Sequence, residues 1–150
     1  MSFTPLNPGF EARVRDSFAR QAAMSLIGAR LGVVAPGRCE IELPVRPDLT
    51  QQHGYVHGGV VGMIADSAGG YAAFTLMPAE ASVLTIEYKI NMLAPAEGET
   101  LLAVGEVLRP GRSISVAQVE VFGVRGTERH RVAAVQQTLM VMAGLQEERV

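Results

Sequence analysis

The sequence lacks tryptophan, contains a single cysteine and carries no run of basic residues. One cysteine, Cys39, cannot form an intramolecular disulfide, so we expect a buried thiol rather than a nucleophile, and a cytoplasmic setting. The formal net charge is -2 with acidic and basic residues interspersed, which argues against nucleic-acid binding. The N-terminus lacks the basic and apolar regions of a signal peptide. These absences exclude a disulfide scaffold and disfavour a nucleic-acid partner.

Residues 60–77 form an almost wholly apolar stretch whose length comes close to that of a membrane span. Asp66 near its centre and three glycines argue against a transmembrane helix, and polar strand-like segments follow it. At 150 residues, of which 48% are hydrophobic, the chain is long enough to bury one sizeable core. We therefore expect a single domain over residues 1–150 and no membrane partner.

The spacing of apolar residues predicts the order of the secondary-structure elements. An amphipathic helix is predicted over residues 10–27, and strand structure over residues 31–45 with a turn at Pro36-Gly37. Small and large apolar residues alternate through residues 58–77, which predicts a long buried helix that Pro78 ends. Turn signals then separate four strands, predicted over residues 82–93, 100–108, 114–122 and 131–142.

This order predicts an α+β fold. A single long apolar helix can satisfy an antiparallel sheet only if the sheet curls around it. Glycines inside the helix indicate that a sheet or a neighbouring helix approaches its backbone closely. The first of the four strands alternates apolar and polar residues, so one face should pack. That apolar face consists of Leu84, Ile86, Tyr88, Ile90 and Met92.

One motif carries the functional hypothesis, namely a loop that ends in His57-Gly58-Gly59 and opens the buried helix. The first N–H groups of a helix have no partner within the helix and can bind a ligand oxygen. Asp66, two turns further on, is the only acidic residue between His57 and Glu80. A carboxylate in an apolar segment is costly unless it is hydrogen-bonded, which makes Asp66 a candidate functional residue.

Gly58 and Asp66 lie eight residues apart, which puts them about 12 Å apart along a straight helix. One chain cannot bring both to the same carbonyl group. If both act on one substrate, Asp66 must come from a second subunit whose helix lies antiparallel to the first. The spacing therefore predicts at least a homodimer with two equivalent sites.

The motif and its surroundings resemble the hotdog-fold acyl-CoA thioesterases of the PaaI-like, phenylacetate-degradation type. The likeness rests on His57-Gly58-Gly59 with Asp66 nine residues after the histidine, on residues 91–96, and on residues 109–113. It implies a sheet of five or six antiparallel strands wrapped around a long central helix. It also implies hydrolysis of an acyl-CoA to a free acid and coenzyme A, with no separate cofactor, in a homotetramer built from two dimers.

The resemblance implies roles for individual residues. The Gly58 N–H would polarise the thioester carbonyl, and Asp66 would act as general base or nucleophile. Thr85 stands where the family often carries a serine or threonine that positions water, whereas Gln51 replaces an asparagine that is frequent there. The implied catalytic residues are Asp66, Gly58, His57, Gln51 and Thr85, and those predicted for coenzyme A binding are Gly59, Asn91, Pro95, Arg109, Gly111, Arg112 and Ser113.

The residues leave other interpretations open. His53, His57 and Asp66 could bind a metal, but their loop setting offers no rigid helical face, and we expect no metal ion. His57 could be a purely structural hydrogen-bond donor to neighbouring backbone, and Asp66 a structural carboxylate that caps or bridges the interface. Arg109 and Arg112 suit the phosphates of coenzyme A, or they are solvated turn residues. The alternative functions are an acyl-CoA dehydratase or hydratase of the same fold, and an acyl-CoA-binding protein without catalysis.

Overall fold

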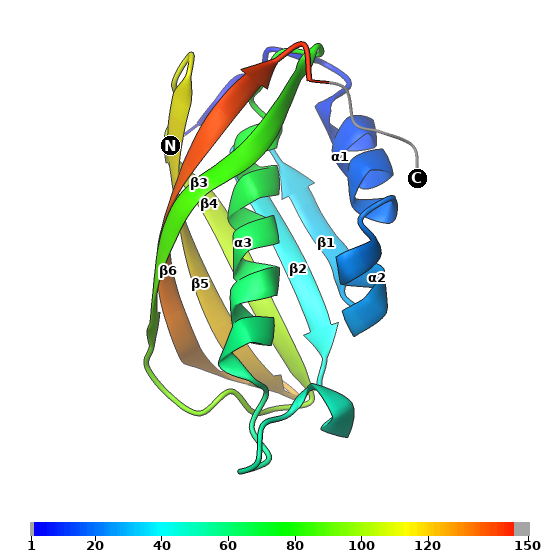
Figure 1. The fold of residues 1–150 in the computed structure, drawn as a ribbon, viewed down its shortest axis with the longest axis vertical. Coiled ribbons are helices and arrows are strands. Elements are labelled where there is room, and N and C mark those ends of the chain that lie inside the picture. The colour runs from blue at the N-terminus through cyan, green and yellow to red at the C-terminus, as the bar shows by residue number, and fades with distance from the viewer. Residues whose placement is uncertain (1, 146–150) are drawn as a thin grey trace.

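The computed structural model of the chain describes residues 2–145, in which short N-terminal helices precede a hairpin, a long helix and four long strands (Figure 1). The elements in chain order are α1 (Phe10–Ala19), α2 (Ala22–Ile27), β1 (Arg30–Ala35), β2 (Arg38–Pro44), the short 3-10 helix η1 (Pro47–Leu49), α3 (Gly58–Phe74), β3 (Ala81–Met92), β4 (Thr100–Arg109), β5 (Ile114–Arg125) and β6 (Glu128–Ala143).

The six strands form one antiparallel sheet, and α3 lies against one side of it. The strand order is β1-β2-β4-β5-β6-β3. In Figure 1 the sheet curls around α3, with β3 and β6 on one side of the helix and β1 and β2 on the other, while α1 and α2 stand beside β1. The predicted α+β architecture, a sheet of five or six strands around a long helix, is confirmed.

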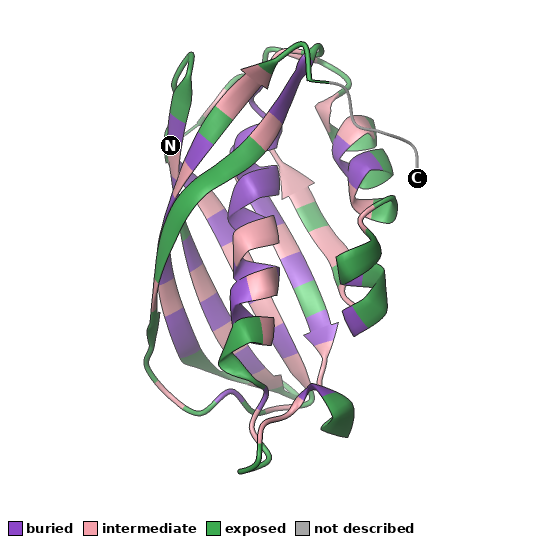
Figure 2. Ribbon diagram, in the orientation of Figure 1, coloured by how far each residue is buried: buried purple, intermediate pink, exposed green. Residues whose placement is uncertain are grey.

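The core lies between α3 and the concave side of the sheet (Figure 2). Gly105 on β4 lets the two layers approach, because a Cβ there would lie 2.4 Å from the Ala68 carbonyl oxygen and 2.8 Å from the Gly69 nitrogen. The predicted close approach to the helix backbone is therefore confirmed, and the sheet makes it. The fully buried side chains of this core include Val61, Ile64, Ile41, Leu101 and Leu139.

The single helix predicted over residues 10–27 is wrong, because α1 and α2 are separate helices. Gln21 between them adopts an extended backbone, with φ -81° and ψ 93°. The break lets the Gln21 side chain accept a hydrogen bond from Ser67 of α3 at 3.1 Å. The apolar spacing runs on through the break, so the pattern gave no sign of it.

The central helix is shorter than the predicted range of residues 58–77. α3 ends at Phe74, with Thr75 as its C-cap, and the N–H groups of Leu76 and Met77 then bond to carbonyls three residues back, at 3.0 and 3.2 Å, as in a tighter turn. The Thr75 side chain bonds in two directions at this point. Its hydroxyl donates to the Ala72 carbonyl at 2.6 Å and accepts from the Gly37 N–H of the β1–β2 turn at 2.8 Å. Among the residues described, no helix is long and apolar enough to cross a membrane.

Strand β3 departs from the predicted alternation of faces. A bulge interrupts its pairing with β6 between Thr85 and Glu87, and Ile86 is the extra residue. Thr85 and Tyr88 therefore both turn toward α3, although strict alternation would place them on opposite faces. The predicted face is wrong because a sequence pattern does not show where a bulge resets the alternation.

The prediction that the apolar face of β3 packs is also wrong within one chain. β3 is an edge strand of the sheet, and most of this apolar face stays exposed among residues 2–145. Ile90 is only half-buried, and the other four side chains are exposed, namely Leu84 by 50%, Ile86 by 49%, Tyr88 by 41% and Met92 by 46%.

Candidate active site

The N-terminus of α3 is capped by His57. Its Nδ1 accepts a hydrogen bond from the Gly59 N–H at 2.9 Å, so the neutral ring carries its proton on Nε2. The structural role that the sequence left open for His57 was that of a donor to neighbouring backbone, whereas here the ring accepts from it. Gly58 is the first residue of the helix, and its N–H has no partner among the described residues. A Cβ at Gly58 would meet nothing within 4 Å, so the space beside this free donor is open.

The loop before α3 is held by its own hydrogen bonds. The His57 N–H donates to the Leu49 carbonyl at 2.9 Å, which fixes the point where the helix begins. The Gln51 side chain accepts a hydrogen bond from the His53 N–H through Oε1. Gln51 is predicted at the catalytic site, but within one chain its amide is turned into this loop and does not bond to Asp66.

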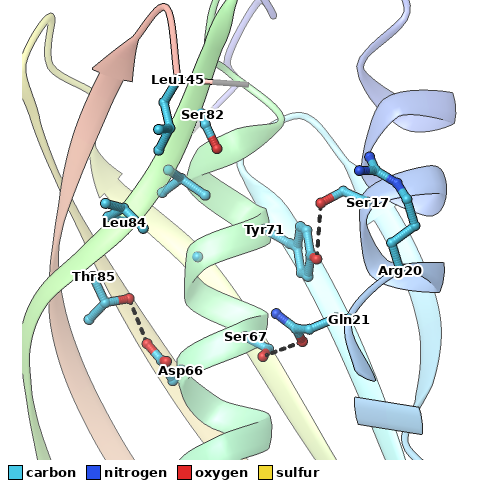
Figure 3. A pocket seen from close by; sticks show the side chains of 12 residues that line it. Ser17, Arg20, Gln21, Asp66, Ser67, Tyr71, Ser82, Leu84, Thr85 and Leu145 are labelled. Atoms are coloured by element: carbon cyan, nitrogen blue, oxygen red, sulfur yellow. Dashed lines mark hydrogen bonds between the residues drawn. The ribbon is translucent and has the colours of Figure 1, made fainter. Parts of the chain in front are cut away.

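Asp66 lies half-buried on α3 and is held by two strands. The Thr85 hydroxyl of β3 donates to Asp66 Oδ1 at 2.7 Å (Figure 3). Nε2 of Gln137 on β6 lies 2.5 Å from the same oxygen, 3.1 Å from the Asp66 carbonyl oxygen and 3.0 Å from Thr85 Oγ1. The structure thus brings together two of the predicted catalytic residues, Asp66 and Thr85, and adds Gln137.

Gln137 is not among the residues that the motif or the resemblance indicates. Its side chain is fully buried, and it lies on the inner face of β6 between the buried residues Val135 and Leu139. A polar residue at an inward position of an alternating strand was the available signal, because buried polar groups need a partner. That signal could not name Asp66 as the partner, since the two residues are 71 positions apart in the chain.

The Asp66 carboxylate borders a cavity of about 540 Å³ that runs along α3 between β3 and the α1–α2 segment (Figure 3). Its far wall is polar, because the hydroxyls of Ser17 and Tyr71 lie 3.2 Å apart and Ser67 donates to Gln21. The volume is in the range of small-molecule sites. Apolar surface on the near side comes from Leu84 and Leu145.

The remaining predicted residues lie at the two ends of α3. His57, Gly58 and Gly59 lie at its N-terminal end. The loop that follows β3 reaches the same end, because its Ala96 carbonyl accepts a hydrogen bond from the N–H of Val56 at 2.8 Å. At the C-terminal end of α3, the turn after β4 borders a second cavity, of about 390 Å³. The residues predicted for coenzyme A binding are thereby split, with Gly59, Asn91 and Pro95 in the first group and Arg109, Gly111, Arg112 and Ser113 in the second.

Cys39 is fully buried within β2, as the expected buried thiol. Burial raises the pKa of this thiol to about 12, so it stays protonated and unreactive near neutral pH. Across residues 2–145, no three His, Cys, Asp or Glu side chains gather closely enough to hold a metal ion.

The comparisons with known proteins fit this geometry. The family model described as "Thioesterase superfamily" matches residues 53–129, which is just over half of the chain. The chain belongs to the Thioesterase superfamily. A solved structure of a thioesterase family protein from Silicibacter pomeroyi has 48% sequence identity with this thioesterase and a TM-score of 0.89. The match covers 91% of this chain and 100% of that one.

More distant relatives extend the same assignment. The PaaI protein from the phenylacetic acid degradation operon of E. coli has a TM-score of 0.82 at 19% identity, over 93% of this thioesterase and 97% of PaaI, and this likeness shows the fold. A 1,4-dihydroxy-2-naphthoyl-CoA hydrolase from Listeria monocytogenes is 27% identical over 95 residues, or 63% of this chain and 77% of that one. The chain spans 59% to 77% of the lengths of the first curated relatives that it matches.

The resemblance inferred from the motif is therefore confirmed. This protein is a member of the Thioesterase superfamily with the hotdog fold, which it shares with the PaaI structure. Its antiparallel sheet, curled around α3, is that fold.

Proposed function

We propose that this thioesterase hydrolyses an acyl-CoA at a site shared by two subunits. The observation that carries the proposal is the Asp66 carboxylate, hydrogen-bonded on its Oδ1 side and bordering a cavity of a size that admits an acyl group. The free N–H of Gly58 supplies the second group, a donor for the carbonyl oxygen of the thioester. No redox cofactor or metal ion takes part, and coenzyme A enters as part of the substrate.

The distance along α3 requires the second subunit. Gly58 is the first residue of α3 and Asp66 lies at its midpoint, so the two are about 12 Å apart along a straight helix. A two-fold partner that brings its Asp66 beside Gly58 must place the symmetry axis level with Gly62, midway between them. At this level of α3, the half-exposed Tyr88 side chain of β3 lies over Gly62, with its hydroxyl 3.0 Å from the Gly62 Cβ position, so Tyr88 is the side chain that would face the partner there.

In the same arrangement, the two groups of residues predicted for coenzyme A binding, which lie at opposite ends of α3 in one chain, would lie at one site. In an antiparallel pair, the C-terminal end of one α3 and the N-terminal end of the other point the same way. The turn of residues 109–113 from the subunit that supplies Asp66 and the loop of residues 91–95 from its partner then flank one site. Arg109 and Arg112 would meet the phosphates of coenzyme A.

The chemistry follows from these groups. Negative charge that develops on the carbonyl oxygen is stabilised by the Gly58 N–H at the positive end of α3. Asp66 of the partner subunit takes a proton from the attacking water as the water oxygen bonds to the carbonyl carbon, or attacks the carbonyl carbon itself and forms a mixed anhydride, which water then hydrolyses to the free acid. The carbon–sulfur bond then breaks, and the coenzyme A thiolate leaves and takes up a proton.

The substitution Asp66→Asn tests the proposal. We expect kcat for acyl-CoA hydrolysis to fall by about 10²- to 10⁴-fold, because the amide cannot accept the proton, while acyl-CoA binding survives. The measurement is release of free thiol from a panel of aryl, short, medium and long acyl-CoAs, with binding followed by calorimetry. Asp48→Asn, which removes a surface carboxylate paired with Arg46, is the matched control. Hydrolysis unchanged in Asp66→Asn contradicts the proposal.

A further inference from the structure

A glutamine amide is buried in the core behind the proposed catalytic carboxylate. Gln137 is fully buried on the inner face of β6, and its Nε2 lies 2.5 Å from Asp66 Oδ1. An ionised carboxylate can only accept hydrogen bonds, so the NH₂ end of the amide must be the end that faces Asp66. The Thr85 hydroxyl donates its one hydrogen to the same Asp66 oxygen and accepts a hydrogen bond from Gln137 Nε2. Three side chains from three elements therefore close one hydrogen-bonded ring.

The other end of the amide is unpaired. Gln137 Oε1 is buried and has no hydrogen-bond partner among the described residues, and it points at Gly69 of α3. A Cβ at Gly69 would lie 2.0 Å from this oxygen and 3.0 Å from Val119 Cγ2, so only glycine leaves room for the amide. A buried acceptor without a partner destabilises a protein, and an apolar side chain would suit this position better for stability alone.

We propose that Gln137 is a positioning residue for the thioesterase reaction and that Gly69 makes room for it. This inference rests on the proposed function, in which Asp66 is the base or nucleophile. Gln137 and Thr85 both donate to Oδ1, and no described residue donates to Oδ2, so the pair fixes the carboxylate with one oxygen left for the reaction. Gln137 does not line the cavity, and it acts through Asp66 without touching substrate.

The pH dependence of the reaction distinguishes this role from a structural one. Donors to the charged form of a carboxylate favour ionisation, so loss of the Gln137 amide moves the acidic limb of the kcat/KM profile to higher pH. The charged or titratable groups near Asp66 are Arg20, which follows α1, and Tyr71 of α3, which both line the cavity, and Tyr88 of β3, which lies over Gly62 one helical turn away, while Thr85 and Gln137 are uncharged. A change at Gln137 leaves Arg20 and Tyr71 in place, so a shift of that limb reports the lost donor.

The test compares Gln137→Met with Gln136→Met. Methionine keeps the length of the side chain and removes both the donor and the unpaired acceptor. Gln136 is the next residue on β6 and is exposed on the opposite face, so its substitution controls for the change of residue type. For Gln137→Met we expect kcat to fall about 10- to 100-fold, KM to stay within about threefold, the acidic limb to move up, and the melting temperature to be equal or higher. A kcat and an acidic limb like those of wild type overturn the inference.

Gly69→Ala tests the same role with the amide still present. The added Cβ meets the far end of a flexible side chain, so the fold can accept it if the amide moves away from Asp66. We expect Gly69→Ala to lose kcat as Gln137→Met does, and to cost little more in the Gln137→Met background. Additive losses in the double variant contradict the inference. Asp66→Asn is assayed in parallel to separate the outcomes. Full hydrolytic activity of Asp66→Asn rejects the proposed function. Loss of activity in Asp66→Asn, together with full activity of Gln137→Met, rejects only the role of Gln137.

Discussion

The N–H of Gly58 can be removed without disturbing the helix that carries it. Gly58 is the first residue of α3, a position where proline is tolerated because the N–H has no partner within the helix. The preceding residue, His57, has φ -58° and ψ 136°, an extended conformation that is compatible with a following proline. A single residue therefore offers a test of the proposed carbonyl donor that leaves the fold intact.

For Gly58→Pro we expect kcat to fall by about 10²- to 10³-fold, as for other lost donors to a carbonyl oxygen, with little change in melting temperature. The measurement is the rate of thiol release from acyl-CoA at saturating substrate. Gly58→Ala keeps the N–H while adding bulk, so it should retain far more activity than the proline variant. Equal losses in both variants would show that steric bulk, and not the missing donor, is responsible.

At the scale of the secondary-structure elements, the distance between α3 and the sheet is set from the sheet side. A Cβ at Gly105 of β4 would collide with backbone atoms of Ala68 and Gly69, which cannot move without shifting the helix. By contrast, a Cβ at Gly70 would meet only Leu139 Cδ2, at an ordinary 3.9 Å. The two glycines therefore make a matched pair.

We expect Gly105→Ala to lower the free energy of unfolding by about 1–3 kcal/mol, because the helix must move off the sheet. Gly70→Ala should be neutral or stabilising by up to about 1 kcal/mol, since alanine favours the helix. Urea unfolding followed by circular dichroism measures both. If Gly105→Ala is as stable as wild type, α3 can move away from the sheet without lowering the free energy of unfolding, and the expectation is wrong.

The elements also show how far the sequence pattern reaches. Apolar periodicity predicted the long helix, the hairpin and the four strands, because burial of one face imposes that periodicity directly. It missed the break at Gln21 and the bulge at Ile86, since both are set by contacts with distant elements. Asp66 and Thr85 were predicted from the motif and its resemblance, and the structure joins them. Gln137 could not be placed, because its partner Asp66 lies on α3, 71 positions away in the chain, and only the packing of α3 on the sheet brings the two together.

At the scale of the whole molecule, one chain has two features that a second copy would account for together, namely an uncovered edge strand and two proposed catalytic groups that lie too far apart. The edge strand β3 exposes large apolar side chains, which natural proteins rarely leave uncovered. The free N–H at the start of α3 and the carboxylate at its midpoint cannot reach one carbonyl. An antiparallel partner along α3 and β3 would cover the strand and complete two sites at once, so assembly and activity should depend on the same contact.

Complementation between two inactive variants tests this directly. A mixed dimer of Gly58→Pro and Asp66→Asn subunits holds one site with both lesions and one site with an intact Gly58 and an intact Asp66. Equal co-expression with random pairing should therefore restore about one quarter of wild-type activity, whereas each variant alone stays inactive. Differently tagged subunits allow the mixed species to be purified, and sedimentation should show it as a dimer or a tetramer.

The control replaces the Gly58→Pro subunit with one that carries both substitutions. Paired with Asp66→Asn, it leaves no intact site in any combination, so activity should stay absent although the subunits assemble as before. Recovery in the first mixture and not in the second requires that one chain supplies the N–H and the other the carboxylate. If the purified mixed dimer is as inactive as its parents, each chain must hold its own complete site, and an active monomer in sedimentation would lead to the same conclusion.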